Sequence, residues 1–161
     1  TIFHEFIHCQ QAESCEQRLK QSLGIARQAQ DVGDFMWELT HPFPYAAPGF
    51  VQCYEAFLKA DHLSEIDSIR QQLRGILRQH DYEYMVWQEW KEGFARFIEN
   101  QIKHRLGLPE NHGGKDQPFD RVVFYEGGAH YIGGLSMHNP DLAVQIEALF
   151  ERMFAGEAVA R

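Results

Sequence analysis

Residues 87–107 read WQEWKEGFARFIENQIKHRLG, and this stretch decides the fold class. Its apolar side chains recur at intervals of three and four residues, as they do along one face of an α-helix: Trp87, Trp90, Phe94, Phe97, Ile98, Ile102 and Leu106. Gly107 and Pro109 follow, and both residue types commonly mark the end of a helix. The spacing therefore predicts one long amphipathic helix that packs against a core.

Three other segments also carry a helical pattern. Apolar residues repeat at helical intervals between positions 63 and 77. Near the end of the chain, Asn139 can cap a helix, Pro140 suits its first turn, and apolar residues recur as far as Met153. We also interpret residues 119–137 as one helix, although it contains glycines at 127, 128, 133 and 134. Such glycines let a helix backbone approach a neighbour closely, at a cost of about 1 kcal/mol each relative to alanine.

Two segments interrupt the helical pattern. Residues 31–50 contain three prolines and five aromatic residues, which predicts a structured apolar loop. Residues 107–118 are rich in glycine and proline and predict an exposed connector. Because 161 residues suffice for one well-buried core, we expect a mainly α-helical fold in a single domain that spans residues 1–161.

The composition excludes two classes of partner. A net charge of -8 without any basic stripe argues against nucleic acid, because phosphate binding needs clustered lysine and arginine. No apolar run approaches the roughly 20 residues that a membrane-spanning helix requires. The sequence carries no signal for the oligomeric state.

The cysteines and the first residue bear on cellular location. Cys9, Cys15 and Cys53 are three in number, so they cannot all pair within the chain. The odd count favours a reducing compartment such as the cytoplasm, and we expect free thiols, with Cys9 in the core. The sequence begins at Thr1 and not at a methionine, so we expect that an upstream segment has been removed or is not included.

The first residues contain the pattern H-E-x-x-H as His4-Glu5-Phe6-Ile7-His8. On a helix, residues four apart share a face, so His4 and His8 present their imidazoles side by side, as two ligands of a tetrahedral zinc ion must. Glu5 lies at the edge of this face, where it can reach a metal-bound water without being a ligand. Phe6 and Ile7 are expected to point towards the core. The alternative is two surface histidines beside a solvated glutamate.

Two histidines leave a catalytic zinc site incomplete, because such a site takes three protein ligands and keeps one open position. Glu92 is the candidate for the third ligand, since the small residues Gly93 and Ala95 allow a second helix to pack closely beside it. Glu126 is a rival for the same role. The alternative is that Glu92 belongs to the solvated face of an amphipathic helix, together with Glu89, Arg96 and Glu99.

Taken together, HEFIHCQQ and EGFARFIE resemble the gluzincin class of zincin metallopeptidases. KEGFA at 91–95 is similar to the N-E-G-F-A stretch of the aminopeptidase N group, and FYEGGAHYIGGL is similar to the tyrosine- and glycine-rich helix that follows the glutamate in many helical gluzincins. The resemblance covers three short pieces of the chain. It implies a helical catalytic domain, one Zn²⁺ per chain bound by His4, His8 and Glu92, and a peptide or protein substrate.

The resemblance also implies catalytic roles. Glu5 is the general base, which takes a proton from a zinc-bound water and passes it to the leaving amine. A tetrahedral oxyanion needs a hydrogen-bond donor besides zinc. Tyr131 is the preferred donor, and Tyr125 and His130 are the alternatives.

The chain departs from the gluzincin pattern in three ways. The interval from His8 to Glu92 is long, so a helical segment must be inserted between them. Many gluzincins place an acid that orients a histidine four residues after the third ligand, and this chain has Arg96 there. The strands that normally precede the first helix are missing, which leaves part of the substrate groove absent. The orienting acceptor would then be a backbone carbonyl or one of three acids, Glu89, Glu99 or Asp120.

Two other functions stay open at this stage. The chain can be a helical binding or scaffold module that retains a metallopeptidase-like fold without turnover. The replacement of the orienting acid by Arg96 and the missing strands favour this function. The chain can also be a zinc hydrolase of a non-peptide substrate, because H-E-x-x-H specifies the metal and not the bond that is cleaved.

Overall fold

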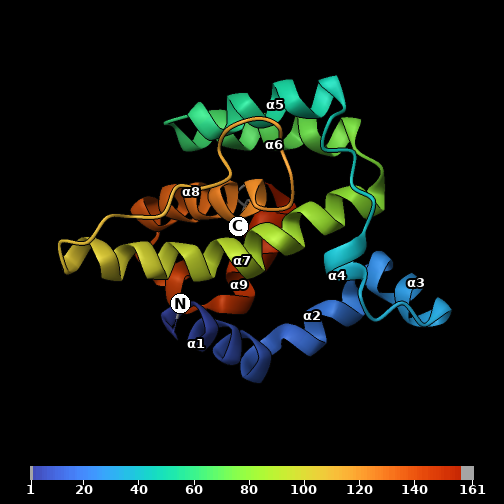
Figure 1. The fold of residues 1–161 in the computed structure, drawn as a ribbon, viewed down its shortest axis with the longest axis horizontal. Helices are drawn as coiled ribbons and strands as arrows, with labels where there is room; N and C mark the ends of the chain where they lie inside the picture. The colour runs from blue at the N-terminus through green and yellow to red at the C-terminus, as the bar shows by residue number, and fades with distance from the viewer. Residues whose placement is uncertain (1, 157–161) are drawn as a thin grey trace.

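The computed structural model describes residues 2–156 and is mainly α-helical (Figure 1). Its helices are α1 (Ile2–Gln11), α2 (Gln17–Ser22), α3 (Gly24–Val32), α4 (Trp37–Thr40), α5 (Pro48–Lys59), α6 (Leu63–Ile76), α7 (Gln79–Arg105), α8 (Val123–His138) and α9 (Ile146–Ala155). A π-helical turn (η1, Ala12–Glu16) lies between α1 and α2, and a 3₁₀ turn (η2, Pro140–Val144) lies between α8 and α9. Residues 2–156 contain no β-strand, which confirms the predicted fold class. Thr1 and residues 157–161 of the predicted domain lie outside the described residues.

The long helix α7 is the central element of the molecule. In Figure 1 it crosses the structure with α8 on one side and α1 on the other, and both helices contact it. Trp87 and Trp90 on α7 are completely buried. Gly107 has a φ of 67°, a left-handed conformation that favours glycine, so the helix ends where the sequence predicts.

The other predicted elements agree with the structure in position but less well in their limits. The helix at 63–77 is observed as α6, and the helix predicted over 119–137 begins later, at Val123. The segment after Asn139 is divided between η2 and α9, and the Asn139 side chain makes no capping hydrogen bond. Residues 107–118 contain no helix, as predicted.

The prediction of a loop over residues 31–50 was partly wrong. The segment contains the short helix α4 and the start of α5, in whose first turn Pro48 lies. Proline is favoured at the start of a helix because its fixed φ suits the helix and its missing N–H would have no partner there. Proline clusters therefore mark helix starts here as well as loops.

Glycines determine how closely α7 and α8 approach. A Cβ atom added at Gly128 would lie 2.1 Å from the carbonyl oxygen of Glu89, and one added at Gly93 would lie 2.5 Å from the Cα of Gly128. No side chain fits at either position, so the two backbones are in direct contact. The expectation of close approach is confirmed at Gly128. It is wrong at Gly133, where an added Cβ would meet only the Phe97 ring at 3.9 Å.

The polar face of α7 is buried and not solvated, contrary to the alternative considered from the sequence. The exposed fractions are 0% for Glu89, 4% for Arg96 and 5% for Glu99. Glu89 accepts hydrogen bonds of 2.7 Å from both Tyr54 and Arg70, and Arg70 is also 0% exposed. Burial raises the pKa of Glu89, and these two donors act in the opposite direction. Arg70 of the neighbouring helix α6 therefore balances the charge of Glu89, although the sequence pattern suggested that Glu89 faces water.

Two further features bear on the sequence predictions. Within residues 2–156, no helix combines the length and the apolar character needed to cross a membrane. The three cysteines are free thiols, as predicted. Cys9, however, is exposed and not in the core, because it lies on the side of α1 that faces away from α7.

Candidate metal centre

The H-E-x-x-H pattern lies on α1, which packs on α7 with its histidine face inward. Ile7 packs against the core, as predicted, whereas Phe6 is 61% exposed, contrary to expectation. Gln11, at the end of α1, is completely buried, and its side-chain amide donates a 3.1 Å hydrogen bond to the carbonyl of Trp90. The helix is therefore held by Ile7 and Gln11, and its outer side is open.

The structure brings His4, His8 and Glu92 together in one cluster. The Nε2 atom of His4 lies 3.1 Å from Oε2 of Glu92, and Nε2 of His8 lies 3.4 Å from the same oxygen. One potential ligand atom from each residue lies within 4.8 Å of the other two. The side chains are 15%, 20% and 13% exposed in that order, so the cluster is largely covered but still reachable.

Two of the three separations between potential ligand atoms match those around a tetrahedral zinc ion. Ligand atoms bound at 2.0–2.1 Å in tetrahedral geometry lie about 3.3 Å from one another. The two nitrogen–oxygen distances of 3.1 and 3.4 Å are close to that value. Two imidazoles and one carboxylate are also the donor set of a known type of catalytic zinc site. Among the described residues, no other group of histidine, cysteine and acidic side chains gathers in this way.

The charges of Glu92 and the two histidines are coupled. Burial alone would raise the pKa of Glu92, but the hydrogen bonds and charges of His4 and His8 hold it well below its usual range. Burial lowers the pKa of His8, but hydrogen bonds with Glu92 and Gln11 outweigh it, and the pKa is raised overall. Glu92 is therefore ionised at neutral pH, as a metal-binding carboxylate must be.

Each histidine has a side-chain oxygen near its second ring nitrogen, at hydrogen-bond distance for His8 and at ion-pair distance for His4. Nδ1 of His8 lies 3.1 Å from the side-chain oxygen of Gln11. When Nδ1–H donates to this oxygen in the neutral imidazole, Nε2 is the nitrogen whose lone pair can bind a metal ion, which is the tautomer that a metal ligand needs. Nδ1 of His4 lies 3.8 Å from Glu99, one of the acids predicted for this role.

The other two acids predicted for this role are used elsewhere, and Gln11 was missed. Glu89 pairs with Arg70, and the Asp120 carboxylate accepts a hydrogen bond from the backbone N–H of Val122. Gln11 follows His8 by three residues on the same helix, a spacing that brings side chains together. That spacing was the sequence signal for Gln11, but the predicted acceptors were only three acids and a backbone carbonyl.

Arg96 does not orient a histidine. It donates to the carbonyl of Gly113, lies 3.5 Å from Glu126, and stacks over the ring of Tyr125 at 5.1 Å. Because Gly113 belongs to the connector between α7 and α8, Arg96 holds this loop against the helix pair. The residue at the position of the usual acid has a structural use here.

Of the three candidates for the oxyanion donor, only Tyr125 lies beside the cluster. Its ring is 6.3 Å from that of His4 and nearly parallel to it. Burial and the neighbouring Glu92 raise the pKa of Tyr125 to about 12, so its hydroxyl stays protonated at neutral pH. Tyr131, the preferred candidate, is completely buried; its hydroxyl donates to Asp67 at 3.0 Å and accepts from Arg152 at 2.7 Å. The structure does not bring Tyr131 to the cluster.

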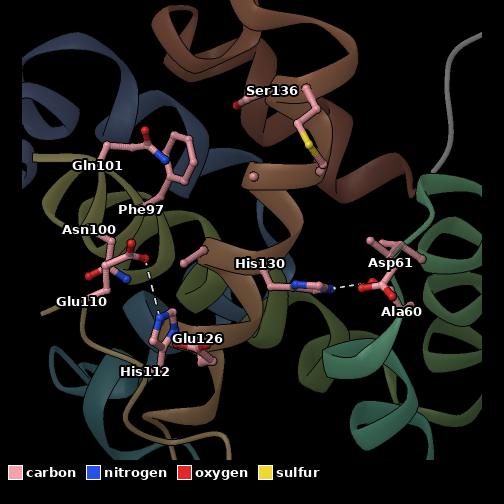
Figure 2. Close-up of a pocket in the computed structure, with 15 residues that line it drawn as sticks. Ala60, Asp61, Phe97, Asn100, Gln101, Glu110, His112, Glu126, His130 and Ser136 are labelled. Carbon is pink, nitrogen blue, oxygen red and sulfur yellow. Dashed lines mark hydrogen bonds and ion pairs between the residues drawn. The ribbon is translucent and has the colours of Figure 1, made fainter. Parts of the chain in front are cut away.

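Glu126 and His130 line a separate cavity of about 560 Å³ between α8, the second half of α7 and the connector (Figure 2). Glu126 lies 2.9 Å from Nδ1 of His112, and Nε2 of His130 lies 2.9 Å from the carbonyl oxygen of Ala60. None of the three metal-cluster residues lines this cavity. The structure therefore places the rival ligand Glu126 away from the histidine pair.

Glu5 is exposed on α1, between the two histidines along the chain. Among residues 2–156, its carboxylate has no hydrogen-bond or ion-pair partner. An unpaired carboxylate at the edge of the histidine face is free to accept a proton from water, as the sequence predicts for a general base.

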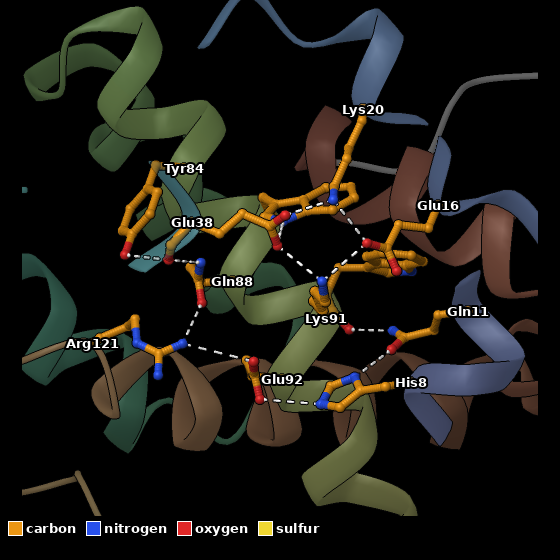
Figure 3. Close-up of polar contacts among 12 residues, drawn as sticks. His8, Gln11, Glu16, Lys20, Glu38, Tyr84, Gln88, Lys91, Glu92 and Arg121 are labelled. Carbon is orange, nitrogen blue, oxygen red and sulfur yellow. Dashed lines mark hydrogen bonds and ion pairs between the residues drawn. The ribbon is translucent and has the colours of Figure 1, made fainter. Parts of the chain in front are cut away.

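A network of charged side chains lies beside Glu92 (Figure 3). Lys91, the preceding residue, pairs with Glu16 at 3.0 Å and with Glu38 at 2.9 Å. Lys20 of α2 pairs with the same two acids. The four side chains link α2, η1 and α4 to α7 beside the metal cluster.

On its other side, Glu92 faces an arginine that sequence analysis did not single out. Nη1 of Arg121 lies 3.7 Å from Oε1 of Glu92 and donates to the side chain of Gln88 at 3.4 Å (Figure 3). Arg121 lies just before α8, far from Glu92 along the chain, so no local spacing in the sequence predicts this contact.

Comparisons with protein-family models, with curated proteins and with solved structures found no significant match to this chain.

Proposed function

We propose that this protein is a zinc-dependent hydrolase of peptide bonds, in which His4, His8 and Glu92 bind one Zn²⁺. The observation that carries the proposal is the convergence of two imidazole nitrogens on one carboxylate oxygen at 3.1 and 3.4 Å. The outer-sphere contacts of Gln11 and Glu99 and the ionised state of Glu92 support it. The resemblance to gluzincins supports the choice of a peptide substrate.

Each residue has a distinct part in the proposed reaction. Zinc, when bound, supplies a Lewis acid that polarises a carbonyl and makes water more acidic. The exposed Glu5 takes the proton of the attacking water and passes it to the leaving amine. Tyr125, whose pKa of about 12 keeps its hydroxyl protonated, donates a hydrogen bond to the oxyanion in place of Tyr131.

Metal analysis and turnover assays of three proteins test the proposal. The purified wild type should contain about one zinc per chain, and His4→Ala should contain almost none. Glu5→Gln should keep its zinc and lose turnover of a peptide library, since Glu5 is a base and not a ligand.

The other outcomes identify the rival functions. Zinc in the wild type with no turnover of peptides or esters indicates a metal-binding module without catalysis. Turnover of esters alone indicates a hydrolase of another bond. Metal far below one equivalent in both the wild type and His4→Ala disproves the metal site itself.

A further inference from the structure

We infer that Arg121 binds the carboxylate of a substrate beside the metal centre, so that the enzyme cleaves close to a free carboxyl terminus. The inference rests on the proposed function and specifies its substrate class. It starts from the position of Arg121 in Figure 3, where the guanidinium lies on the side of Glu92 away from His8.

The two oxygens of Glu92 face different partners. Oε2 faces the histidine pair, and Oε1 lies 3.7 Å from Nη1 of Arg121. The guanidinium also lies over the ring of Tyr125 at 5.4 Å. Arg121 is therefore adjacent both to a proposed ligand and to the proposed oxyanion donor.

Arg121 has more free hydrogen-bond donors than Arg96, the arginine on the neighbouring turn of the site. A guanidinium carries five N–H donors, and the hydrogen bond of Arg121 to Gln88 is long, at 3.4 Å. Its side chain is 31% exposed, compared with 5% for Arg96, which is held by Gly113 and Glu126. Arg121 can thus offer a pair of parallel N–H groups to a carboxylate from solvent.

The local charge selects an anion. Without a metal, Glu92 balances the charge of Arg121. A divalent cation bound by Glu92 would neutralise the carboxylate. The positive charge of the Arg121 guanidinium would then have no counter-charge at the edge of the site. A carboxylate relieves this imbalance, whereas an ammonium group increases it. In a chain with a net charge of -8, such a site is a local exception.

The distances restrict where the carboxylate lies in the substrate. Arg121 is separated from the imidazoles by the width of one carboxylate and two contacts of 3.7 and 3.1–3.4 Å. An extended peptide advances about 3.3–3.6 Å per residue. A carboxylate on Arg121 therefore lies no more than about two or three residues from a peptide bond held at the histidines.

Binding to a non-hydrolysing form of the protein tests the inference. Calorimetry with zinc-supplemented Glu5→Gln protein compares three N-acetylated tetrapeptides. Two are tetra-alanine, one with a free carboxyl terminus and one with a terminal carboxamide. The third is a carboxamide with three alanines followed by aspartate. We expect the free acid to bind about ten- to a hundredfold more tightly than either carboxamide, as for a hydrogen bond to a charged group.

Substitutions at Arg121 then assign the effect. In the Glu5→Gln background, Arg121→Gln should abolish the preference for the free acid and leave the affinity for the carboxamide unchanged. Arg121→Lys should keep part of the preference, because it retains the charge and loses the planar pair of donors. Arg105→Gln, at the exposed end of α7, is the matched control and should keep all of it.

Three results would overturn the inference. They are equal affinities for acid and carboxamide in the parent protein, a preference that persists in Arg121→Gln, and loss of zinc from Arg121→Gln, which would make Arg121 a support for Glu92. An aspartate carboxamide that binds as tightly as the free acid overturns the assignment to the chain terminus. Failure of the proposed function is recognised separately, by an absence of zinc or of turnover in the wild type.

Discussion

The carboxylate of Glu92 lies 3.1 Å from the imidazole of His4, although 88 residues separate them in the chain. The contact exists only because α1 packs on α7. Gln11 binds the end of α1 to the backbone of α7 through a hydrogen bond. The ion pairs of Lys91 with Glu16 and Glu38 hold the elements that follow α1 against α7. The proposed metal site is thus a product of tertiary packing, so metal binding and the docking of α1 should stabilise each other.

Replacing the proposed third ligand tests this arrangement most directly. Glu92→Gln should weaken zinc binding by more than about a hundredfold, because even changes to outer-sphere partners cost 10–100-fold. Glu126→Gln is the matched control, since Glu126 lines the separate cavity and should leave zinc affinity unchanged. Competition with a chromophoric chelator measures both. A larger loss in the Glu126 variant would restore the rival ligand.

Gln11 should prove to be an outer-sphere residue. Its side-chain oxygen is 3.1 Å from Nδ1 of His8, so Gln11→Ala removes the group that orients this imidazole. We expect a 10–100-fold loss of zinc affinity in the same competition assay. Gln10→Ala changes the exposed neighbour and should have no effect. Equal affinities for the two variants would contradict the role of Gln11.

The sequence was sufficient to predict the histidine pair and its carboxylate partner. Spacing of four residues places His4 and His8 on one face of any helix, whatever the rest of the fold. The juxtaposition with Glu92 depends on tertiary structure, and the resemblance around EGFA supplied it. The acceptor Gln11 could be predicted from local spacing alone, but a side-chain amide was not among the predicted acceptors, which were three acids and a backbone carbonyl.

The choice between tyrosines could not be made from the sequence. Six residues separate Tyr125 from Tyr131, which places Tyr131 about 9 Å further along α8 and on a different side of it. Which tyrosine meets α1 depends on where α8 crosses α7, and the contact between Gly93 and Gly128 sets that crossing. In the same way, the pattern of Glu89 cannot distinguish a solvated face from a buried ion pair until the position of Arg70 is known.

The crossing of α7 and α8 should be intolerant of a single methyl group. In Gly128→Ala the added Cβ would lie 2.1 Å from the Glu89 carbonyl, so the helices must separate. We expect a loss of about 3 kcal/mol in the free energy of unfolding, the upper part of the usual range for overpacking.

Gly133→Ala on the same helix is the control. Its added Cβ would make only a normal contact at 3.9 Å, so the higher helix propensity of alanine should stabilise the protein by up to about 1 kcal/mol. Urea unfolding monitored by circular dichroism measures both variants. Similar effects of the two substitutions would show that backbone contact does not set this crossing.

Glu38 should make the stability of the protein depend on pH. Burial alone would raise its pKa, but Lys91, together with hydrogen bonds from Lys20 and Trp87, lowers it below the ordinary value. The unfolded chain therefore binds a proton at Glu38 more readily than the folded protein does. The stabilisation by ionised Glu38 is complete above about pH 4.5 and is lost as the pH falls through the native pKa.

Glu38→Gln should lower the free energy of unfolding by about 1–3 kcal/mol at pH 7, and this difference from wild type should shrink below pH 4.5. Urea titrations at pH 7, 5.5, 4 and 3 measure this difference, with the exposed Glu151→Gln as control. A wild-type advantage that is the same at all four values would mean that packing, and not the charge of Glu38, holds α4 against α7.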